Sequence, residues 1–235
     1  MLENEWIRIP ARRIIYFVRH RIMEGDCQVE HGPVALDLPA FEILRYPVTN
    51  AQYMRFVRET GYVGEGGGDN FLIHLRHGLN RRNEDLPVTF VSHTEASAYA
   101  AYSQGALPTE AQWQCAAEGP EGLRWPWGNC YDPACLNGGD EGLQPVNAHP
   151  MGASGYGVED LCGNAWEWTR DIAGDGRHQF ALLRGGSWYR GEHFWHFAGG
   201  PHRIHSHEKL PLFVGNFNQA STLSFRCVRE VKDPV

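Results

Sequence analysis

The segment DLCGNAWEW at residues 160–168 is followed by LRGGSW at residues 183–188. Large apolar side chains alternate there with Gly and Ala, which let backbones approach closely. Glu167 stands between Trp166 and Trp168, so it points to the opposite face of any strand that these residues form. A carboxylate among aromatic side chains needs a cation, a backbone donor or a metal ion. Two interpretations are open: a tryptophan core with one hydrogen-bonded carboxylate, or a structural calcium site.

The composition indicates one loop-rich domain rather than a helical bundle. The chain has 235 residues, of which 27 are Gly and 14 are Pro, and this length predicts a single domain over residues 1–235. The net charge of −7 comes without a basic stripe, which argues against a nucleic-acid partner because phosphate binding needs clustered Lys and Arg. No apolar run approaches the ~18 residues of a membrane helix, and the N-terminus is acidic where a signal peptide is basic. We therefore expect a cytoplasmic protein without a membrane partner.

The six cysteines form no CxxC pair and no repeated metal-ligand spacing. Cys130 and Cys135 are close enough in sequence to pair within a loop. In a cytosolic chain, reduced and buried thiols are the expected state for most of the six.

Helices are expected only in the first half of the chain. Capping boxes at residues 49–52, 92–95 and 109–112 each predict a helix start. Alternating residues predict strands at 34–38 and 41–46, whereas residues 1–30 are expected to form an irregular lead-in with one strand at 13–18. Beyond residue 120, the pattern predicts loops and short strands.

Motifs spread from about residue 34 to residue 229 resemble those of the formylglycine-generating enzyme (sulfatase-modifying factor) family. The matching segments are YPVTNAQY (46–53), LPTEAQW (107–113), WPWGN (125–129), GYG (155–157), GNAWEW (163–168), RGGSW (184–188) and FRCVR (225–229). The resemblance implies an α+β, C-type-lectin-like fold with few helices, short twisted strands and much irregular backbone.

The resemblance also implies structural calcium, bound mostly through main-chain oxygens. By motif position, one site would use Cys162 or Gly163, together with Ala165 and Glu167. A second site would use Asn137 and Gly138, with Glu141 and Leu143 as further candidates. Oxygen ligands from carbonyls, Asn and Glu suit a hard cation.

The catalytic feature of the family does not carry over to this sequence. Formylglycine-generating enzymes follow the Gly-Gly-Ser motif with two cysteines that bind copper and activate oxygen. The corresponding positions here are Arg190 and Trp195. Because a guanidinium and an indole cannot act as thiolate ligands, formylglycine generation by that mechanism is not expected, and the sequence does not establish whether the chain is an enzyme.

The segment that replaces the cysteine pair has two interpretations. The first is a binding surface for a protein or a small molecule, built from aromatic, His and Arg side chains on loops over a rigid scaffold. Its candidate residues are Tyr189, Arg190, His193, Trp195, His196, Phe197, His202, Asn216 and Asn218. In one branch of the family, the proteins diversified by retroelements, residues in this interval vary to create new specificities, which makes residues 189–218 a candidate variable face.

The second interpretation is an iron or copper centre for an oxidase or hydroxylase. The spacings His193-xx-His196 and His202-xx-His205-x-His207 could supply neutral imidazoles to such a metal. Histidine clusters in loops are more often hydrogen-bonded surface groups than ligands, so the binding surface is the preferred hypothesis. Metal content separates the two.

Overall fold

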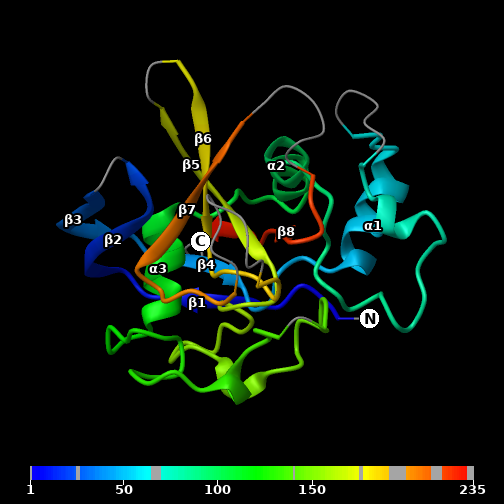
Figure 1. Cartoon of the computed structure of the whole chain (residues 1–235). Coiled ribbons are helices and arrows are strands. Elements are labelled where there is room, and N and C mark those ends of the chain that lie inside the picture. The colour runs from blue at the N-terminus through cyan, green and yellow to red at the C-terminus, as the bar shows by residue number, and fades with distance from the viewer. Residues whose placement is uncertain are drawn as a thin grey trace.

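The computed structural model (Figure 1) describes residues 2–24, 27–64, 70–139, 141–174, 177–190, 200–212 and 219–231, without the side chains of residues 20–31. The fold is α+β with few helices and long loops, as predicted. The helices are α1 (Asn50–Thr60), α2 (His93–Tyr102) and α3 (Glu110–Glu118), with short 3₁₀ turns at Ile73–Leu75, Pro133–Cys135 and Pro150–Gly152. The strands are β1 (Trp6–Ile9), β2 (Arg12–Glu24), β3 (Cys27–Leu38), β4 (Phe41–Leu44), β5 (Trp166–Gly174), β6 (Gln179–Arg184), β7 (Ser206–Pro211), β8 (Leu223–Ser224) and β9 (Val228–Glu230).

Two sheets organise the strands. An antiparallel sheet with the order β1-β4-β9 brings the two ends of the chain together, and a larger sheet has the order β3-β2-β7-β6-β5-β8. The β2–β7 and β5–β8 pairs are parallel, and the other neighbours in the larger sheet are antiparallel. The loop segment that follows α3, green in Figure 1, lies below these strands and carries two of the 3₁₀ turns.

The three helices begin where the capping boxes predict. In α1, the Thr49 side chain accepts from the Gln52 backbone N–H at 3.3 Å, and the Gln52 side chain accepts from the Thr49 N–H at 2.8 Å. The same reciprocal pair caps α2 and α3. These boxes satisfy backbone donors that have no partner within the first turn. Local sequence is therefore sufficient to fix each helix start.

The expectation of an irregular lead-in over residues 1–30 is wrong. Those residues contain β1 and the long hairpin of β2 and β3, although the strand expected at 13–18 is present within β2. Ile14 pairs with Leu36 across the hairpin, and β2 then runs parallel to β7, with Arg19 opposite Ser206. The lead-in is extended chiefly through its pairing with the adjacent strand β3, and β7 joins it only at Arg19 and His20.

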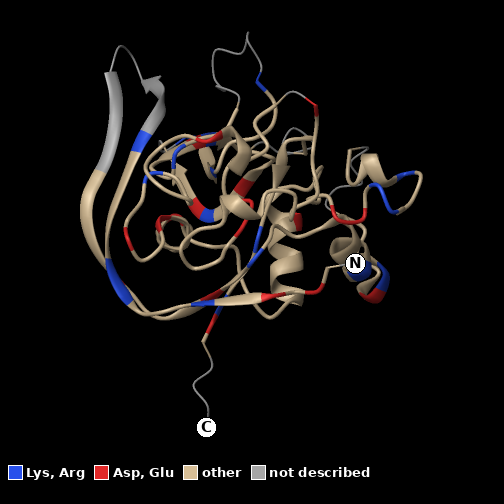
Figure 2. Ribbon diagram, turned by 90° about the horizontal axis from the view of Figure 1, so that it is seen from below, with Lys and Arg blue, Asp and Glu red and all other residues tan. Residues whose placement is uncertain are grey.

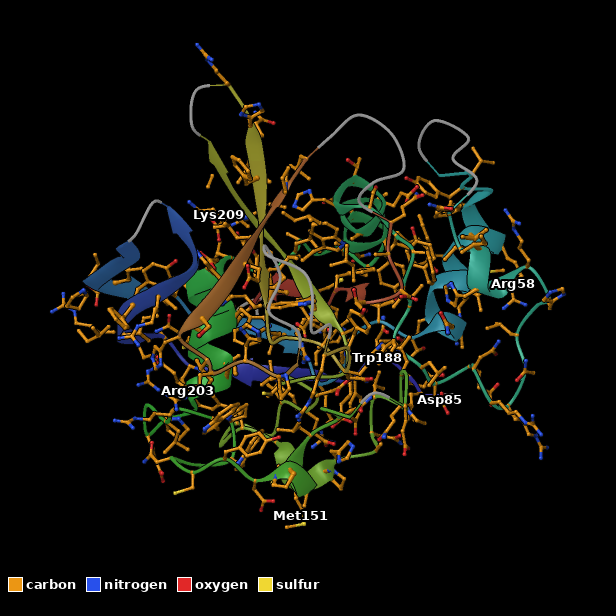
Figure 3. The ribbon with its side chains drawn as sticks, viewed as in Figure 1. Arg58, Asp85, Met151, Trp188, Arg203 and Lys209 are labelled. Atoms are coloured by element: carbon orange, nitrogen blue, oxygen red, sulfur yellow. The ribbon has the colours of Figure 1, made fainter. Side chains whose placement is uncertain are left out.

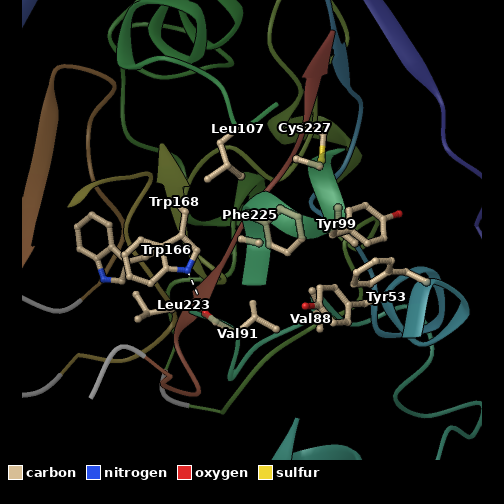
Figure 4. Close-up of a cluster of buried hydrophobic side chains, with 14 of the residues drawn as sticks. Tyr53, Val88, Val91, Tyr99, Leu107, Trp166, Trp168, Leu223, Phe225 and Cys227 are labelled. Atoms are coloured by element: carbon tan, nitrogen blue, oxygen red, sulfur yellow. Dashed lines mark hydrogen bonds between the residues drawn. The ribbon is translucent and has the colours of Figure 1, made fainter. Parts of the chain in front are cut away.

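Strand β5 separates two buried clusters. Trp166 and Trp168 pack into the first cluster, shown in Figure 4, where Trp168 Nε1 donates to the Val91 carbonyl oxygen at 3.1 Å. Glu167, one residue between them, points instead toward Trp113 in the second cluster. The alternation read from the sequence therefore holds: two tryptophans fill one side of the strand and the carboxylate is directed to the other.

Charged residues of both signs are interspersed over the described ribbon (Figure 2). Within the part of the chain that the structure describes, no helix is long and apolar enough to cross a membrane. The spacing of Cys130 and Cys135 would permit a disulfide within one loop, but both residues are free thiols.

Candidate functional site

A fully buried ion pair joins Glu167 to Arg226. The Arg226 Nε and NH2 atoms each donate at 2.7 Å, to Oε2 and Oε1 of the carboxylate respectively, and Trp113 Nε1 donates to Oε2 at 2.9 Å. The remaining Arg226 donors reach the main-chain oxygens of residues 44, 45, 159 and 160. The guanidinium therefore ties β4, the loop before β5, and β5 itself to the segment between β8 and β9.

This pairing bears on the calcium expected at the Gly163–Glu167 centre. Both oxygens of the Glu167 carboxylate already receive charged donors, so its side chain does not fit the role of a calcium ligand. The structure instead favours the interpretation of a hydrogen-bonded carboxylate within a tryptophan core. The main-chain oxygens of Cys162 or Gly163, Ala165 and Glu167 are the remaining members of the expected set, and this part of the assignment stays a prediction.

A network of side-chain amides surrounds the same loop. Asn164 Nδ2 donates to Asp160 Oδ2 at 2.8 Å, while its Oδ1 accepts from Asn137 Nδ2 and from the Gln144 N–H, each at 3.0 Å. Burial raises the pKa of Asp160 well above its ordinary value, and Glu167 and Glu159 raise it further, against the lowering effects of Asn164 and Arg226. Burial therefore disfavours the charged form of the Asp160 carboxyl, and a bound cation would oppose that effect.

A cavity of about 520 Å³ lies beside this network, and Arg190 forms part of its wall. The Arg190 Nε donates to the Gly138 carbonyl oxygen at 2.5 Å, which fixes the guanidinium against the loop that follows Pro133–Cys135. The lining residues are Tyr131, Pro133, Leu136, Asn137, Gly138, Gly139, Glu141, Gln144, His149 and Arg190. The cavity therefore unites Arg190, from the expected binding face, with Asn137 and Gly138, from the expected second calcium site.

Two main-chain oxygens of the expected second calcium site already accept hydrogen bonds, and the assignment stays a prediction. The Gly138 carbonyl oxygen accepts a guanidinium donor, and the Asn137 carbonyl oxygen accepts from the Asn164 N–H at 2.8 Å. Asn137 Nδ2 is directed at the Gly142 carbonyl oxygen at 2.9 Å. Among the residues described, no group of three or more His, Cys, Asp or Glu side chains is arranged to hold a metal.

The residues next to Arg190 differ in their access to solvent. Tyr189 is exposed, and its ring meets that of Trp188 edge-on with 5.6 Å between centroids. Figure 3 shows Trp188 above the loop layer that carries Met151. His202 is only 4% exposed and packs on the Trp166 ring at 4.6 Å between centroids. Tyr189 and Arg190 are therefore reachable by a ligand, whereas His202 contacts the core.

Two other histidines of the candidate metal set contact buried carboxylates. His205 Nε2 lies 2.7 Å from Glu118 Oε1, and His207 Nδ1 lies 2.6 Å from Glu110 Oε1. Glu110 also accepts from the Tyr16 hydroxyl at 2.7 Å and lies 3.5 Å from an Arg184 nitrogen. These contacts join α3 to β2 and β7, so each histidine has a place in the scaffold.

Six of the nine expected ligand-binding residues lie outside the described residues: His193, Trp195, His196, Phe197, Asn216 and Asn218. Sequence reasoning missed Tyr131, Gln144 and His149 in the cavity wall. These residues lie on loops between the motifs, where no regular spacing identifies them as site residues. Only the folded arrangement places them around Arg190.

The family model of the sulfatase-modifying factor enzyme 1-like domain matches residues 20–231. A hercynine oxygenase of Mycolicibacterium thermoresistibile is 33% identical over 200 residues, covering 65% of this chain and 45% of that protein. The inactive C-alpha-formylglycine-generating enzyme 2 of Mus musculus is 32% identical over 209 residues, covering 68% of this chain and 65% of that protein. The chain thus spans less than two thirds of the length of these relatives.

Two solved structures share the fold at 17% identity. PvdO from Pseudomonas aeruginosa superimposes with a TM-score of 0.68 over 97% of this chain and 95% of its own. Treponema denticola variable protein 1 superimposes with a TM-score of 0.66 over 98% of this chain and 96% of its own. With the family match over most of its length, the chain belongs to the formylglycine-generating enzyme (sulfatase-modifying factor) family, with its C-type-lectin-like fold but without its catalytic cysteine pair.

Proposed function

We propose that this chain is a catalytically diverged family member that acts as a binding module, with its ligand held in the cavity beside Arg190. One observation carries the proposal: a guanidinium stands at the motif position of the first catalytic cysteine, and it lines a cavity of about 520 Å³. Cavities of roughly 300–1,000 Å³ suit small ligands or a protruding side chain of a partner protein. The cationic group favours binding over thiolate chemistry at this position.

The cavity walls are held by the scaffold. His149 Nδ1 lies 3.1 Å from the Ala134 carbonyl oxygen, and its Nε2 lies 2.8 Å from Gln144 Oε1. Gln144 in turn donates its N–H to Asn164 in the central network. Because these side chains are already ordered, little conformational entropy is lost when a ligand enters. A preformed cavity on loops over a rigid core supports the binding role.

A narrower form of the proposal makes residues 189–218 a retroelement-diversified face. The C-type-lectin-like fold is compatible with it, and Tyr189 and Arg190 begin the interval. Near-identical chains encoded in one genome should then differ mainly within residues 189–218. If residues 189–218 are identical among such chains and the differences lie elsewhere, the hypothesis of a diversified face is wrong. The chain would then be a binding module of fixed specificity.

The competing proposal is a metal-dependent oxidase or hydroxylase that uses iron or copper. A hercynine oxygenase is among the relatives, which keeps oxygen chemistry under consideration. With His205 and His207 bound to carboxylates, this proposal rests on His193 and His196. Elemental analysis of the purified protein for calcium, iron, copper and zinc separates the two. Stoichiometric iron or copper, lost in the His193→Ala or His196→Ala variant, would make the chain an oxygen-using enzyme.

The binding role is tested by screening a library of small polar molecules for shifts in melting temperature. We expect hits whose effect is lost in the Arg190→Ala variant and kept in Arg58→Ala. Arg58 is a matched control because it is an exposed arginine on α1 whose Nε donates to the Met54 carbonyl oxygen of the same helix. Molecules that stabilise the Arg190→Ala variant as much as the wild type would contradict a ligand site in this cavity. A screen in which no molecule shifts the melting temperature would contradict it as well.

A further inference from the structure

Tyr131 gives the cavity beside Arg190 an aromatic wall. The residue is 46% exposed, so a large part of its ring can be reached by a ligand. Its ring meets that of the buried Trp125 edge-on with 5.3 Å between centroids, and Trp125 stacks on Trp127 at 5.5 Å with 19° between the ring planes. Trp127 Nε1 donates to the Cys130 carbonyl oxygen at 3.0 Å, which ties the loop that carries Tyr131. A planar ligand could therefore stack on a ring that is already supported.

The loop of residues 141–144 supplies a hydrogen-bond acceptor and a donor to the same cavity. Glu141 is exposed, and none of the residues that the structure describes donates to its carboxylate. Gln144 Oε1 lies 2.8 Å from His149 Nε2, so this oxygen is engaged, whereas Gln144 Nε2 donates to no described residue. The wall therefore offers carboxylate oxygens and an amide N–H group that the scaffold does not use.

A planar ring with an amino group beside a ring nitrogen matches these three features. The amino group can donate to the Glu141 carboxylate, and the neighbouring ring nitrogen can accept from Gln144 Nε2. Adenine and cytosine carry such a donor and acceptor side by side on one edge, and their faces stack well on aromatic side chains. A purely apolar ring would leave both polar groups without partners, and a non-planar molecule would lose the stacking contact.

We propose that the cavity binds an uncharged, planar nitrogen heterocycle of the aminopurine or aminopyrimidine class. The ring stacks on Tyr131, its amino group donates to Glu141, and its adjacent ring nitrogen accepts from Gln144. The inference rests on the proposed binding function and names its ligand class. It places no ligand group on Arg190, which enters only as part of the cavity wall.

The test begins with calorimetric titration of adenine and cytosine into the purified full chain. Each base is compared with an analogue that lacks the amino group: purine for adenine and pyrimidin-2-one for cytosine. At least one amino base should bind about tenfold or more tightly than its analogue, because a hydrogen bond to a charged acceptor is lost in the analogue. If neither amino base binds, or if both analogues bind as tightly as the amino bases, the heterocycle assignment is wrong.

Variants of Tyr131 test the stacking contact. Tyr131→Ala should weaken the amino base about tenfold or more, whereas Tyr131→Phe keeps the ring and should bind as the wild type does. Tyr102→Ala is the matched control, because Tyr102 is 38% exposed on α2 and does not line the cavity. An amino base that binds Tyr131→Ala as tightly as the wild type would overturn the assignment.

Variants of the loop assign the two hydrogen bonds. Glu141→Ala should weaken the amino base and leave its analogue unchanged. Gln144→Glu keeps an oxygen facing His149 but replaces the amide donor, so it should weaken the base and the analogue alike. Glu141→Ala keeps the test decisive if Tyr131→Ala unfolds, since no hydrogen bond of the described scaffold depends on the Glu141 carboxylate. Equal losses for base and analogue in Glu141→Ala would contradict the placing of the amino group.

The outcomes also separate this inference from the broader proposal. If library molecules bind in dependence on Arg190 and neither adenine nor cytosine binds, the binding module stands and the heterocycle assignment is wrong. If neither the bases nor the library molecules bind, the cavity is no ligand site and both proposals fail.

Discussion

Arg226 and Glu167 form a two-pronged ion pair in which the guanidinium is wholly buried and the carboxylate is 1% exposed. Every nitrogen of the guanidinium donates a hydrogen bond, and four of these bonds go to main-chain oxygens around the pair. Removing either charge leaves the other buried without compensation. The pair is therefore a structural centre between two cores, rather than a group available to substrate or metal.

The Glu167→Gln variant tests this centre. We expect the free energy of unfolding to fall by about 3–5 kcal/mol, because Arg226 keeps its charge and loses its partner. Urea unfolding followed by tryptophan fluorescence measures the loss. Asp37→Asn is the control, since it breaks a solvent-exposed pair with Arg13 and should leave the midpoint unchanged. An unchanged midpoint in Glu167→Gln would show that the pair does not stabilise the fold.

Gly163 offers a second test of the same loop. Its φ of +80° is one that side chains rarely adopt, and a Cβ there would collide with the Asn137 carbonyl oxygen. Gly78 has nearly the same φ, +81°, with no atom within 4 Å of the added Cβ. Gly78→Ala should therefore cost only the backbone strain, about 1–2 kcal/mol, whereas Gly163→Ala should cost more because Asn137 must move.

Thermal or urea unfolding of the two alanine variants measures this difference directly. Since the backbone strain is common to both, the excess loss in Gly163→Ala reports the contact between the GNAWEW segment and the Asn137 loop. Equal losses would mean that the Asn137 loop moves without measurable cost and does not stabilise the GNAWEW segment.

Sequence alone was sufficient for the parts of the fold that short-range chemistry determines. The capping pair Thr49–Gln52 and the alternation around Glu167 both act over a few residues, and both predictions are confirmed. The strands expected at 13–18 and 34–38 lie within β2 and β3, but their extension toward residues 24 and 27 and their pairing as one hairpin are not predicted.

The candidate site was harder to predict from the sequence. Arg190 was identified by its motif position, but the Gly138 oxygen it contacts is 52 residues away in sequence. Tyr131 and His149 reach the cavity from loops with no repeating pattern, so nothing in their spacing predicts it. Long-range closure of loops, not local propensity, forms the wall.

The Glu110–His207 pair predicts a pH dependence of stability. Burial alone would raise the pKa of Glu110, but Arg184, His207 and Tyr16 outweigh it and lower that pKa from 4.5 to about 2. A carboxylate with a lowered folded-state pKa stabilises the fold above its unfolded-state pKa, and this contribution is lost as the pH falls through the folded-state value. We therefore expect the free energy of unfolding to decline between pH 4.5 and pH 2.

The Glu110→Gln variant isolates this contribution. Because the variant cannot bind the proton, its stability should be lower than that of the wild type at pH 6 and should decline less steeply below pH 4.5. Urea unfolding at half-unit pH intervals gives the slope, with Glu121→Gln as an exposed control. Parallel curves for the wild type and Glu110→Gln would show that another carboxylate controls the acid transition.

Asp160 gives opposite predictions with and without calcium. Burial holds its pKa well above the ordinary value, so in calcium-free buffer the Asp160 carboxyl lowers the stability of the folded state at neutral pH. Asp160→Asn removes the ionisable group, and we expect it to raise the melting temperature of the chelator-treated protein. If calcium binds Asp160 with the Gly163 and Ala165 oxygens, added calcium should stabilise the wild type and leave the variant unchanged. Melting curves in EGTA and in millimolar calcium give all four values. A wild type whose melting temperature does not respond to calcium would contradict the cation site and leave Asp160 as a buried carboxyl supported by Asn164 and Arg226.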